Sequence, residues 1–261
     1  MYGNNKYEGP NPESDDAMHG THVAGIIAAE RDNGMGANGV ANNARIMVLR
    51  AVPDGDEYDK DIAKAIRYAA DNGAKVINGS FGKYHSTNPE WVWDAIKYAA
   101  TKDVLFVNAA GNEALNTDET QVYPQDQELA GAEVSDNFLT VGALNYEYGS
   151  DLIANFSNFG KSSVDVFAPG VQIYSTAPND EYITIGGTSM AAPGVAGIAA
   201  MIRSYYPKLT AAQVKQVIMD SGVSTAARVK VGGDKTMSFK DLSTSGKMAN
   251  LYNALILASK I

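Results

Sequence analysis

The sequence predicts an α/β fold in which a mainly parallel central sheet is covered by helices on both faces. Short, continuous apolar runs alternate along the chain with longer segments whose apolar residues recur every three or four positions. Continuous apolar runs are typical of parallel strands that are buried on both faces. The chain has 261 residues, 45% of them hydrophobic, which is enough for one sizeable core. We therefore expect a single domain over residues 1–261.

The first half of the chain supplies the expected elements in alternation. Residues 1–18 are polar and rich in glycine and proline, so they should form a loop that leads into a helix over residues 19–29. We then expect, in chain order, a strand over Arg45–Val52, a helix over Asp61–Ala70, a strand over Lys75–Asn78, a helix over Trp91–Ala100 and a strand over Val104–Val107.

Helical patterns dominate the last third of the chain. Apolar residues recur at helical spacing directly after Ser189, which predicts a buried helix. Thr210 and Gln213 form the capping-box pattern that opens a second helix. Residues 224–247 contain several glycines and serines and should form a loop or hairpin before a final helix over residues 248–259.

Composition and charge exclude several classes of function. Asp and Glu number 30 against 21 Lys and Arg, a net charge of −9. Nucleic acid is therefore not an expected partner, because phosphate binding needs a basic face. The absence of cysteine excludes disulfides, thiolate metal sites and a cysteine nucleophile. The sequence contains no run of 18 apolar residues, so it predicts no membrane-spanning helix.

Ser189 stands in a stretch of small residues, Gly187-Thr188-Ser189-Met190-Ala191-Ala192-Pro193, at the start of the predicted buried helix. Unpaired N–H groups and the helix dipole favour developing negative charge at such a position. Glycines just before the serine would let a substrate approach the backbone closely. The alternative is an ordinary N-cap, because serine is a preferred capping residue.

Only three histidines could serve as a general base for this serine. His19 lies where a polar turn feeds the predicted helix, and it could accept the proton of a serine hydroxyl. His22 lies three residues further on and is expected to be packed or hydrogen-bonded, whereas His85 lies in a polar loop and should be solvated. His19 and His22 could also ligate a metal, but no HExxH pattern or nearby carboxylate pair supports a metal site.

Two polar segments follow predicted strands, at the sheet edge where functional groups collect in open α/β folds. Ser80-Phe81-Gly82 follows one strand, and Ala109-Ala110-Gly111-Asn112 follows the next. The Asn112 side-chain amide could donate a hydrogen bond to an oxyanion. The alternative is a simple turn, for which Gly-Asn is a common dipeptide.

Three motifs, HGTHVAGIIAA over residues 19–29, VNAAGN over 107–112 and GTSMAAP over 187–193, occur together in this order. In this order and spacing the chain resembles the subtilisin-like serine peptidases, the subtilases, from about Gly9 to the C-terminus. The resemblance implies the three-layer subtilisin-like α/β fold. It further implies that Ser189 is the nucleophile, that His19 is its general base, and that Asn112 and the Ser189 backbone N–H form the oxyanion hole.

The resemblance also implies how a polypeptide substrate is held. Ser80-Phe81-Gly82 matches the segment that pairs with the substrate backbone by β-augmentation. With Ala109-Ala110-Gly111 opposite, it would also form the primary specificity pocket. Met190, beside the nucleophile, would make activity sensitive to oxidation.

One part of the family pattern is missing from the sequence. The family's triad aspartate lies in an Asp-Ser/Thr-Gly context at the end of the first strand, well before the histidine. Residues 1–18 contain no such tripeptide, and Asp15 and Asp16 lie too close to His19 in sequence to replace it. We therefore expect an N-terminally truncated fold with a gap in its core, which an upstream segment, a propeptide or a complementing chain could fill. Gly79, where the family more often has Met or Leu, should loosen the packing nearby.

Two acidic stretches, residues 54–61 and 112–137, carry the oxygen ligands that calcium prefers, and calcium sites are frequent in the family. Solvated loops explain these stretches equally well. No cofactor is required by the predicted chemistry, and calcium is expected at most as a structural ion.

The sequence therefore predicts a serine endopeptidase that cuts polypeptides through an acyl-enzyme on Ser189, with its triad aspartate outside this chain. The alternative is an inactive subtilase-like fragment that binds a peptide or a complementing chain. A lipase or esterase is less well supported, because no Gly-x-Ser-x-Gly elbow surrounds the serine. By family resemblance the protein should be secreted or located in the cell envelope.

Overall fold

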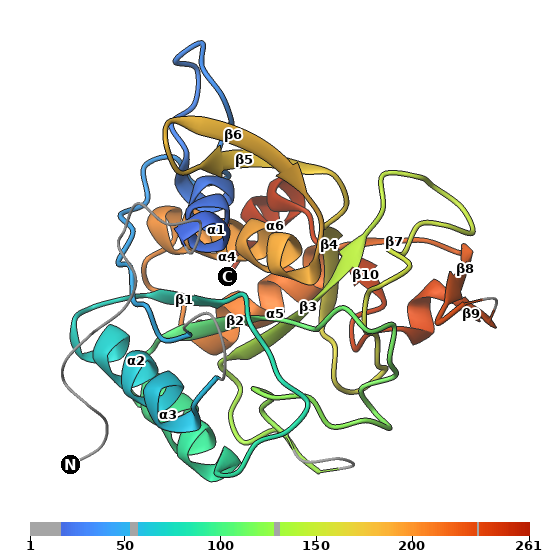
Figure 1. Ribbon diagram of the computed structural model, residues 1–261, viewed down its shortest axis with the longest axis horizontal. Helices are drawn as coiled ribbons and strands as arrows, with labels where there is room; N and C mark the ends of the chain where they lie inside the picture. The colour runs from blue at the N-terminus through green and yellow to red at the C-terminus, as the bar shows by residue number, and fades with distance from the viewer. Residues whose placement is uncertain (1–16, 53–56, 128–130, 234) are drawn as a thin grey trace.

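A six-stranded, mainly parallel sheet forms the centre of the fold (Figure 1). The structure is a computed structural model and describes residues 17–52, 57–127, 131–233 and 235–261. The strands lie in the order β1-β2-β3-β4-β10-β7, and only β7 runs antiparallel to its neighbour. Their bounds are β1 Val76–Gly79, β2 Leu105–Ala109, β3 Phe138–Leu144, β4 Val166–Pro169, β10 Lys247–Met248 and β7 Val223–Ser224.

Helices cover both faces of this sheet, as the sequence predicts. The core on one face joins Leu105 and Val107 of β2 to three helices, α4 Thr188–Tyr205, α5 Ala211–Ser221 and α6 Leu251–Ala258. Phe106, between them in sequence, points the other way because strand side chains alternate. It packs with α2 Asp59–Asp71 and α3 Pro89–Thr101 on the second face. The α/β fold class is therefore confirmed.

Helix α1, Met18–Ala28, packs between α4 and the hairpin of β5 Ile173–Ala177 and β6 Glu181–Ile185. His22 holds this arrangement from inside, because its ring is fully buried and its Nε2 lies 3.1 Å from the Ile173 carbonyl oxygen. The prediction of a packed, hydrogen-bonded His22 is confirmed. The helix begins at Met18, so the predicted loop ends earlier than residue 18, whereas Asp15 and Asp16 lie outside the described residues.

The C-terminal predictions hold with small shifts. Thr210 and Gln213 form the capping box of α5 as expected. The segment 224–247 contains a hairpin of β8 Arg228–Val231 and β9 Lys235–Ser238, followed by the short 3-10 helix η2 Phe239–Asp241. The final helix begins later than predicted, because Met248 belongs to β10.

Arg45–Val52 is not a strand, and this prediction is wrong. Three of its apolar side chains are exposed to water instead: Val48 is 82% exposed, and Ile46 and Met47 are 44% and 41% exposed. The next strand along the chain, β1, lies at the edge of the sheet. Among the described strands it pairs only with β2. A strand needs a neighbouring strand to pair with as well as a suitable sequence, and Arg45–Val52 pairs with none of the described strands.

Gly79 does not loosen the packing, contrary to expectation. The ring of Phe106 fills the space in front of it, because a Cβ built on Gly79 would lie 2.6 Å from the Phe106 Cε1 atom. Phe106 in turn stacks on Phe138, with ring centroids 5.0 Å apart. The Phe106 ring, stacked on Phe138, thus occupies the space that a side chain at residue 79 would fill.

Candidate active site

Ser189 lies in the first turn of α4, with buried neighbours on both sides. The N-cap position of this helix is Gly187, and Ser189 itself follows Thr188 inside the helix. The Ser189 hydroxyl donates a hydrogen bond to the Ser80 carbonyl oxygen at 3.2 Å and makes no capping bond. The alternative in which Ser189 is only an N-cap is therefore excluded.

Ser80 comes to this helix from the carboxyl end of β1. Its hydroxyl donates to the Ser189 carbonyl oxygen at 2.8 Å and accepts a hydrogen bond from the Asn78 side-chain amide at 2.9 Å. Two hydrogen bonds in opposite directions thus join Ser80 and Ser189. The predicted nucleophile and the start of the predicted substrate-binding segment lie side by side.

Asn112 reaches the same helix terminus from the carboxyl end of β2. Its Oδ1 atom accepts hydrogen bonds from the backbone N–H and the side-chain hydroxyl of Thr188, both at 2.9 Å. All the hydrogen bonds that its side chain makes within the described part of the chain reach Oδ1. The amide NH₂ group is therefore available as a donor, next to Gly187 and Ser189.

Two residues that the sequence did not single out fix this geometry. The Thr188 hydroxyl also accepts the Gly111 backbone N–H at 3.0 Å, so it holds the whole Gly111-Asn112 turn. Asn158 donates to the Ala110 carbonyl oxygen at 2.8 Å and accepts the Leu115 N–H at 2.9 Å. Thr188 stands within the quoted motif and was within reach of sequence reasoning, whereas Asn158 has no local signal.

Gly111 is required in this turn for two reasons. Its φ angle is +104°, which side chains rarely adopt. A Cβ at this position would also lie 2.3 Å from Nδ2 of Asn158 and 3.1 Å from the Tyr84 hydroxyl. A side chain at residue 111 would therefore not fit, because Asn158 and Tyr84 occupy the space in front of Gly111.

His19 lies in the first turn of α1 and is exposed. Because α1 packs against α4, the helices that begin near His19 and Ser189 are neighbours (Figure 1). Desolvation of part of the ring and the neighbouring His22 lower the pKa of His19. A lowered pKa favours the neutral imidazole that a general base needs. Among the described residues no hydrogen bond joins His19 to Ser189, whose hydroxyl is turned to Ser80.

The acidic stretches are not simple solvated loops. Asp118 accepts hydrogen bonds from the backbone N–H groups of Lys161 and Ser162, at 2.6 and 3.0 Å. Asp126 is buried, and Glu133 pairs with Lys215 at 2.9 Å. In the parts of the chain that the structure describes, no three His, Asp or Glu side chains are grouped so that they could hold a metal ion.

Comparison with known proteins gives consistent matches. The sequence profile of the subtilase family matches residues 1–246. The thermophilic serine proteinase of Bacillus sp. (strain AK1) is 46% identical over 188 residues, covering 71% of this chain and 42% of that protein. The cell wall-associated protease of Bacillus subtilis (strain 168) is 37% identical over 228 residues, covering 87% of this chain and 24% of that protein. This chain thus spans less than half the length of either relative.

The fold comparison agrees with the sequence matches. A solved protease from Pseudoalteromonas arctica superposes with a TM-score of 0.74 and 29% identity, covering 92% of this chain and 70% of that one. The family profile covers nearly the whole chain, and hydrogen bonds join two of the three motifs, those of Asn112 and Ser189, at the start of α4. The chain belongs to the subtilase family of serine proteases.

Proposed function

We propose that the chain is the catalytic part of a serine endopeptidase that cleaves polypeptides through an acyl-enzyme on Ser189. The observation that carries this proposal is the junction at the start of α4. There hydrogen bonds join Ser189 to Ser80, the first residue of the proposed substrate-binding segment. Thr188, next to Ser189, fixes the Asn112 amide by further hydrogen bonds. A nucleophile, an oxyanion donor and a strand edge therefore meet at one helix N-terminus.

In the proposed reaction, the Ser189 hydroxyl leaves Ser80 and turns to His19. His19 takes the hydroxyl proton as Oγ attacks the scissile carbonyl carbon, and the carbonyl oxygen becomes an oxyanion. The Asn112 NH₂ group and the Ser189 backbone N–H donate hydrogen bonds to that oxyanion. When the C–N bond breaks, the leaving amine takes the proton from His19. Water then hydrolyses the acyl-enzyme, with His19 again acting as base.

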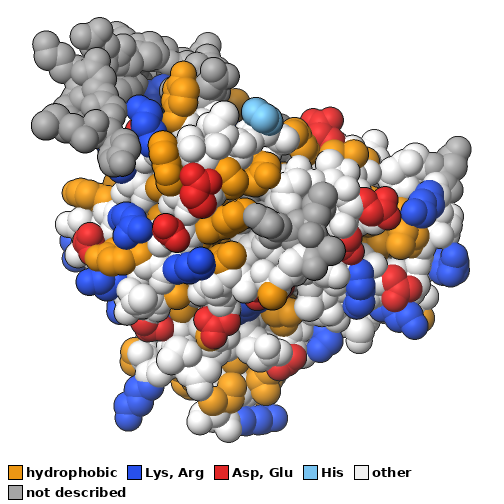
Figure 2. Space-filling view, turned by 90° about the horizontal axis from the view of Figure 1, so that it is seen from below, with side chains coloured by type: hydrophobic (Ala, Val, Ile, Leu, Met, Phe, Trp, Pro, Cys, Tyr) orange, Lys and Arg blue, Asp and Glu red, His pale blue; other side chains and the backbone are white. Residues whose placement is uncertain are grey.

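The polypeptide would add as a strand to the segment Ser80-Phe81-Gly82, with Ala109-Ala110-Gly111 opposite. The backbone geometry supports this assignment, because both segments leave neighbouring parallel strands at their carboxyl ends. On the face shown in Figure 2, the described acidic and basic side chains are interspersed and form no continuous basic surface. The net charge of −9 also supports a polypeptide, and not a nucleic acid, as the substrate.

The carboxylate that orients His19 would come from a segment outside the described residues. Three features support an apolar strand beside β1 as its source. β1 has a free edge within the described sheet, and the apolar run at Ile46, Met47 and Val48 is exposed. Asn78 on β1 also keeps a buried side-chain oxygen without a hydrogen-bond partner among the described residues. A complementing strand would cover this apolar surface and complete the triad.

A second candidate function is peptide binding without catalysis. It is favoured by one observation, that the Ser189 hydroxyl donates to the Ser80 carbonyl oxygen instead of to His19. A serine held in this way could not attack until it rotates. The two candidate functions therefore differ in whether Ser189 can be activated.

Labelling with a fluorescent fluorophosphonate distinguishes them, because this reagent marks only an activated serine. We expect labelling of the parent chain that is lost in Ser189→Ala and strongly reduced in His19→Ala. Intact mass should show one adduct per chain. A folded parent that binds peptide but is not labelled would support binding alone. Faster labelling of a longer chain with an added upstream segment would place the orienting carboxylate in that segment.

The location of the protein and a bound metal ion are proposed from a relative and from the family resemblance. One relative is named as a cell wall-associated protease, which supports an extracellular or envelope location for this chain too. Every helix in the described ranges is too short or too polar to cross a membrane. A structural calcium ion stays a prediction from the family resemblance, since the described carboxylates form no such site.

A further inference from the structure

The segment that would bind the substrate is fixed at both ends. At its start, Ser80 exchanges two hydrogen bonds with Ser189. At its end, Lys83 exchanges two backbone hydrogen bonds with Tyr123, at 2.7 and 2.8 Å. Phe81 and Gly82 lie between these anchors. Tyr123 occupies one side of the segment, so a peptide would pair with the other side.

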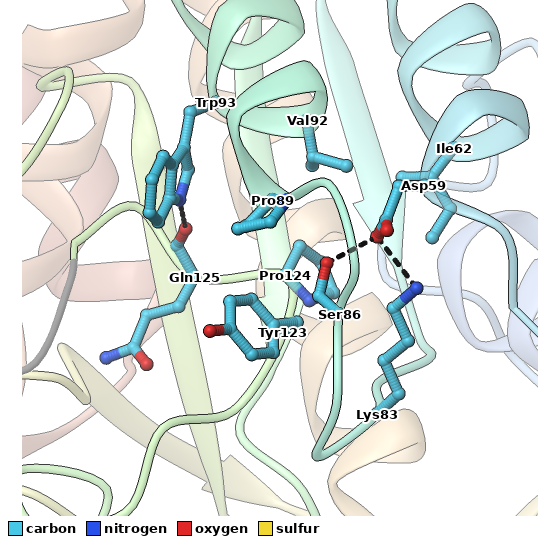
Figure 3. A pocket seen from close by; sticks show the side chains of 10 residues that line it. All are labelled: Asp59, Ile62, Lys83, Ser86, Pro89, Val92, Trp93, Tyr123, Pro124 and Gln125. Carbon is cyan, nitrogen blue, oxygen red and sulfur yellow. Dashed lines mark hydrogen bonds and ion pairs between the residues drawn. The ribbon is translucent and has the colours of Figure 1, made fainter.

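The Lys83 side chain adds a third anchor, because it turns back to the first residue of α2. Its Nζ atom lies 2.7 Å from Oδ1 of Asp59 and also donates to the Glu57 carbonyl oxygen. The Asp59 carboxylate accepts three further hydrogen bonds, from the Ser86 hydroxyl at 2.8 Å, the Asn88 backbone N–H at 3.0 Å and the Thr87 hydroxyl at 3.5 Å. Figure 3 shows Lys83 and Ser86 both directed at Asp59. One carboxylate thus holds the segment and the loop that follows it.

This ion pair is buried, with Asp59 5% exposed and the Lys83 side chain 19% exposed. Burial by itself would raise the pKa of Asp59, but the hydrogen bonds from Lys83, Ser86 and Asn88 together lower it, so the carboxylate is charged. A buried ion pair adds little net stability, because desolvation offsets the attraction. The neighbouring cavity is about 10 Å³ and has room for no more than a water molecule. Neither stability nor ligand binding therefore explains the pair well.

We infer that Asp59 and Lys83 are positioning residues that hold Ser80-Phe81-Gly82 in the extended register needed to pair with a polypeptide substrate. The inference rests on the proposed peptidase function. The pair acts on substrate binding and not on the chemistry at Ser189, because the Ser80 end of the segment is fixed separately. Small reagents that do not pair with the segment should be indifferent to the ion pair.

The test compares Lys83→Met and Asp59→Asn with the parent chain. For a chromogenic peptide of six residues we expect KM to rise about tenfold with kcat nearly unchanged, since the lost interaction supports ground-state and transition-state binding equally. The rate of fluorophosphonate labelling should stay within about twofold of the parent, because that reagent makes no strand pairing. Lys83→Arg should restore most of the peptide affinity, since it keeps the charge.

A matched control is Asp151→Asn, which removes an exposed ion pair with Lys230 at 3.2 Å, far from this segment in the sequence. It should leave both readouts unchanged. Fluorescence anisotropy of a labelled peptide, measured in a Ser189→Ala background, gives the same comparison without turnover.

Three outcomes count against the inference. Equal peptide binding by parent and variants would overturn it while leaving the proposed function intact. A parallel loss of labelling and peptide binding would also overturn it, because it would show a general structural role. A parent chain that neither binds peptide nor is labelled would remove the proposed function, and the inference with it.

Discussion

At the scale of single residues, Thr188 fixes both the Asn112 side chain and the Gly111 backbone. Its backbone N–H and hydroxyl both bind Oδ1 of Asn112, and the same hydroxyl accepts the Gly111 N–H. The Asn112 amide is thereby fixed with its oxygen inward and its NH₂ group outward. An oxyanion donor acts through being fixed before the reaction starts, so its support matters as much as its identity.

This arrangement predicts a graded loss of activity. Asn112→Leu removes the donor, and the magnitude to expect is the loss of about 10²–10³ in kcat measured for such a donor in subtilisin itself. Thr188→Val keeps the shape but removes the hydroxyl, so it should lower kcat by about tenfold, in line with one lost hydrogen bond.

Steady-state kinetics on a peptide substrate measure both effects, and KM should change little. Thr188→Ser retains the hydroxyl and is the matched control. If Thr188→Val and Thr188→Ser were equally active, the hydroxyl would have no part in orienting Asn112.

The three motif residues could be proposed from the sequence because each stands in a local pattern that resembles a family motif, and their catalytic roles stay predictions. Ser189, His19 and Asn112 all lie at the ends of elements that converge. The supporting residues could not be predicted in the same way. Asn158 and Asp59 act on partners far away in sequence, and their own surroundings contain no motif.

At the scale of elements, strand formation depended on partners more than on composition. Val104–Val107 and Arg45–Val52 are both rich in branched apolar residues, yet only the first lies in the sheet. β2 pairs with a neighbour on each side, whereas Arg45–Val52 pairs with no strand in the described structure. Periodicity in the sequence therefore predicted the helices better than it predicted this strand.

Gly79 at the end of β1 gives a prediction about packing between elements. A Cβ there would lie 2.6 and 2.7 Å from two atoms of the Phe106 ring, so the ring must shift and disturb its stacking on Phe138. Gly79→Ala should therefore lower the free energy of unfolding by about 1–3 kcal/mol, as overpacked cores do. Urea denaturation measures this value.

The double variant with Phe106→Leu makes the cause specific. The smaller side chain leaves room for the new methyl group, so the two costs should not add. Gly194→Ala is the control, since nothing lies within 4 Å of its Cβ position in α4 and alanine favours helices. Strictly additive costs for Gly79→Ala and Phe106→Leu would show that the ring is not what Gly79 accommodates.

At the scale of the whole molecule, a buried group of charges ties α5 to the sheet and to the acidic segment 112–137. Lys215 on α5 pairs with Glu133 at 2.9 Å and lies 3.6 Å from Asp165 beside β4. Asp126 belongs to the same group and has a buried carboxyl oxygen without a hydrogen-bond partner among the described residues. Burial raises the pKa of Asp126 to about 8, and the attraction of Lys215 only partly opposes this.

The raised pKa makes stability depend on pH with a definite sign. The folded chain keeps a proton on Asp126 up to about pH 8, whereas an unfolded aspartate loses its proton near pH 4. The folded state therefore binds more protons over this range, and the free energy of unfolding contributed by Asp126 falls as pH rises through it, by roughly 1 kcal/mol per pH unit. Asp126→Asn cannot titrate and should escape this loss.

We expect Asp126→Asn and the parent chain to melt at similar temperatures at about pH 4, with the variant increasingly more stable toward pH 8. Comparing the two at each pH cancels the titration of all other groups. Asp136→Asn, which removes an exposed carboxylate from the same acidic segment, is the matched control for the change of side chain. If the Asp126→Asn curve instead ran parallel to the parent between pH 5 and pH 8, Asp126 would be ionised in the folded chain, and its carboxylate would have to be stabilised directly by Lys215.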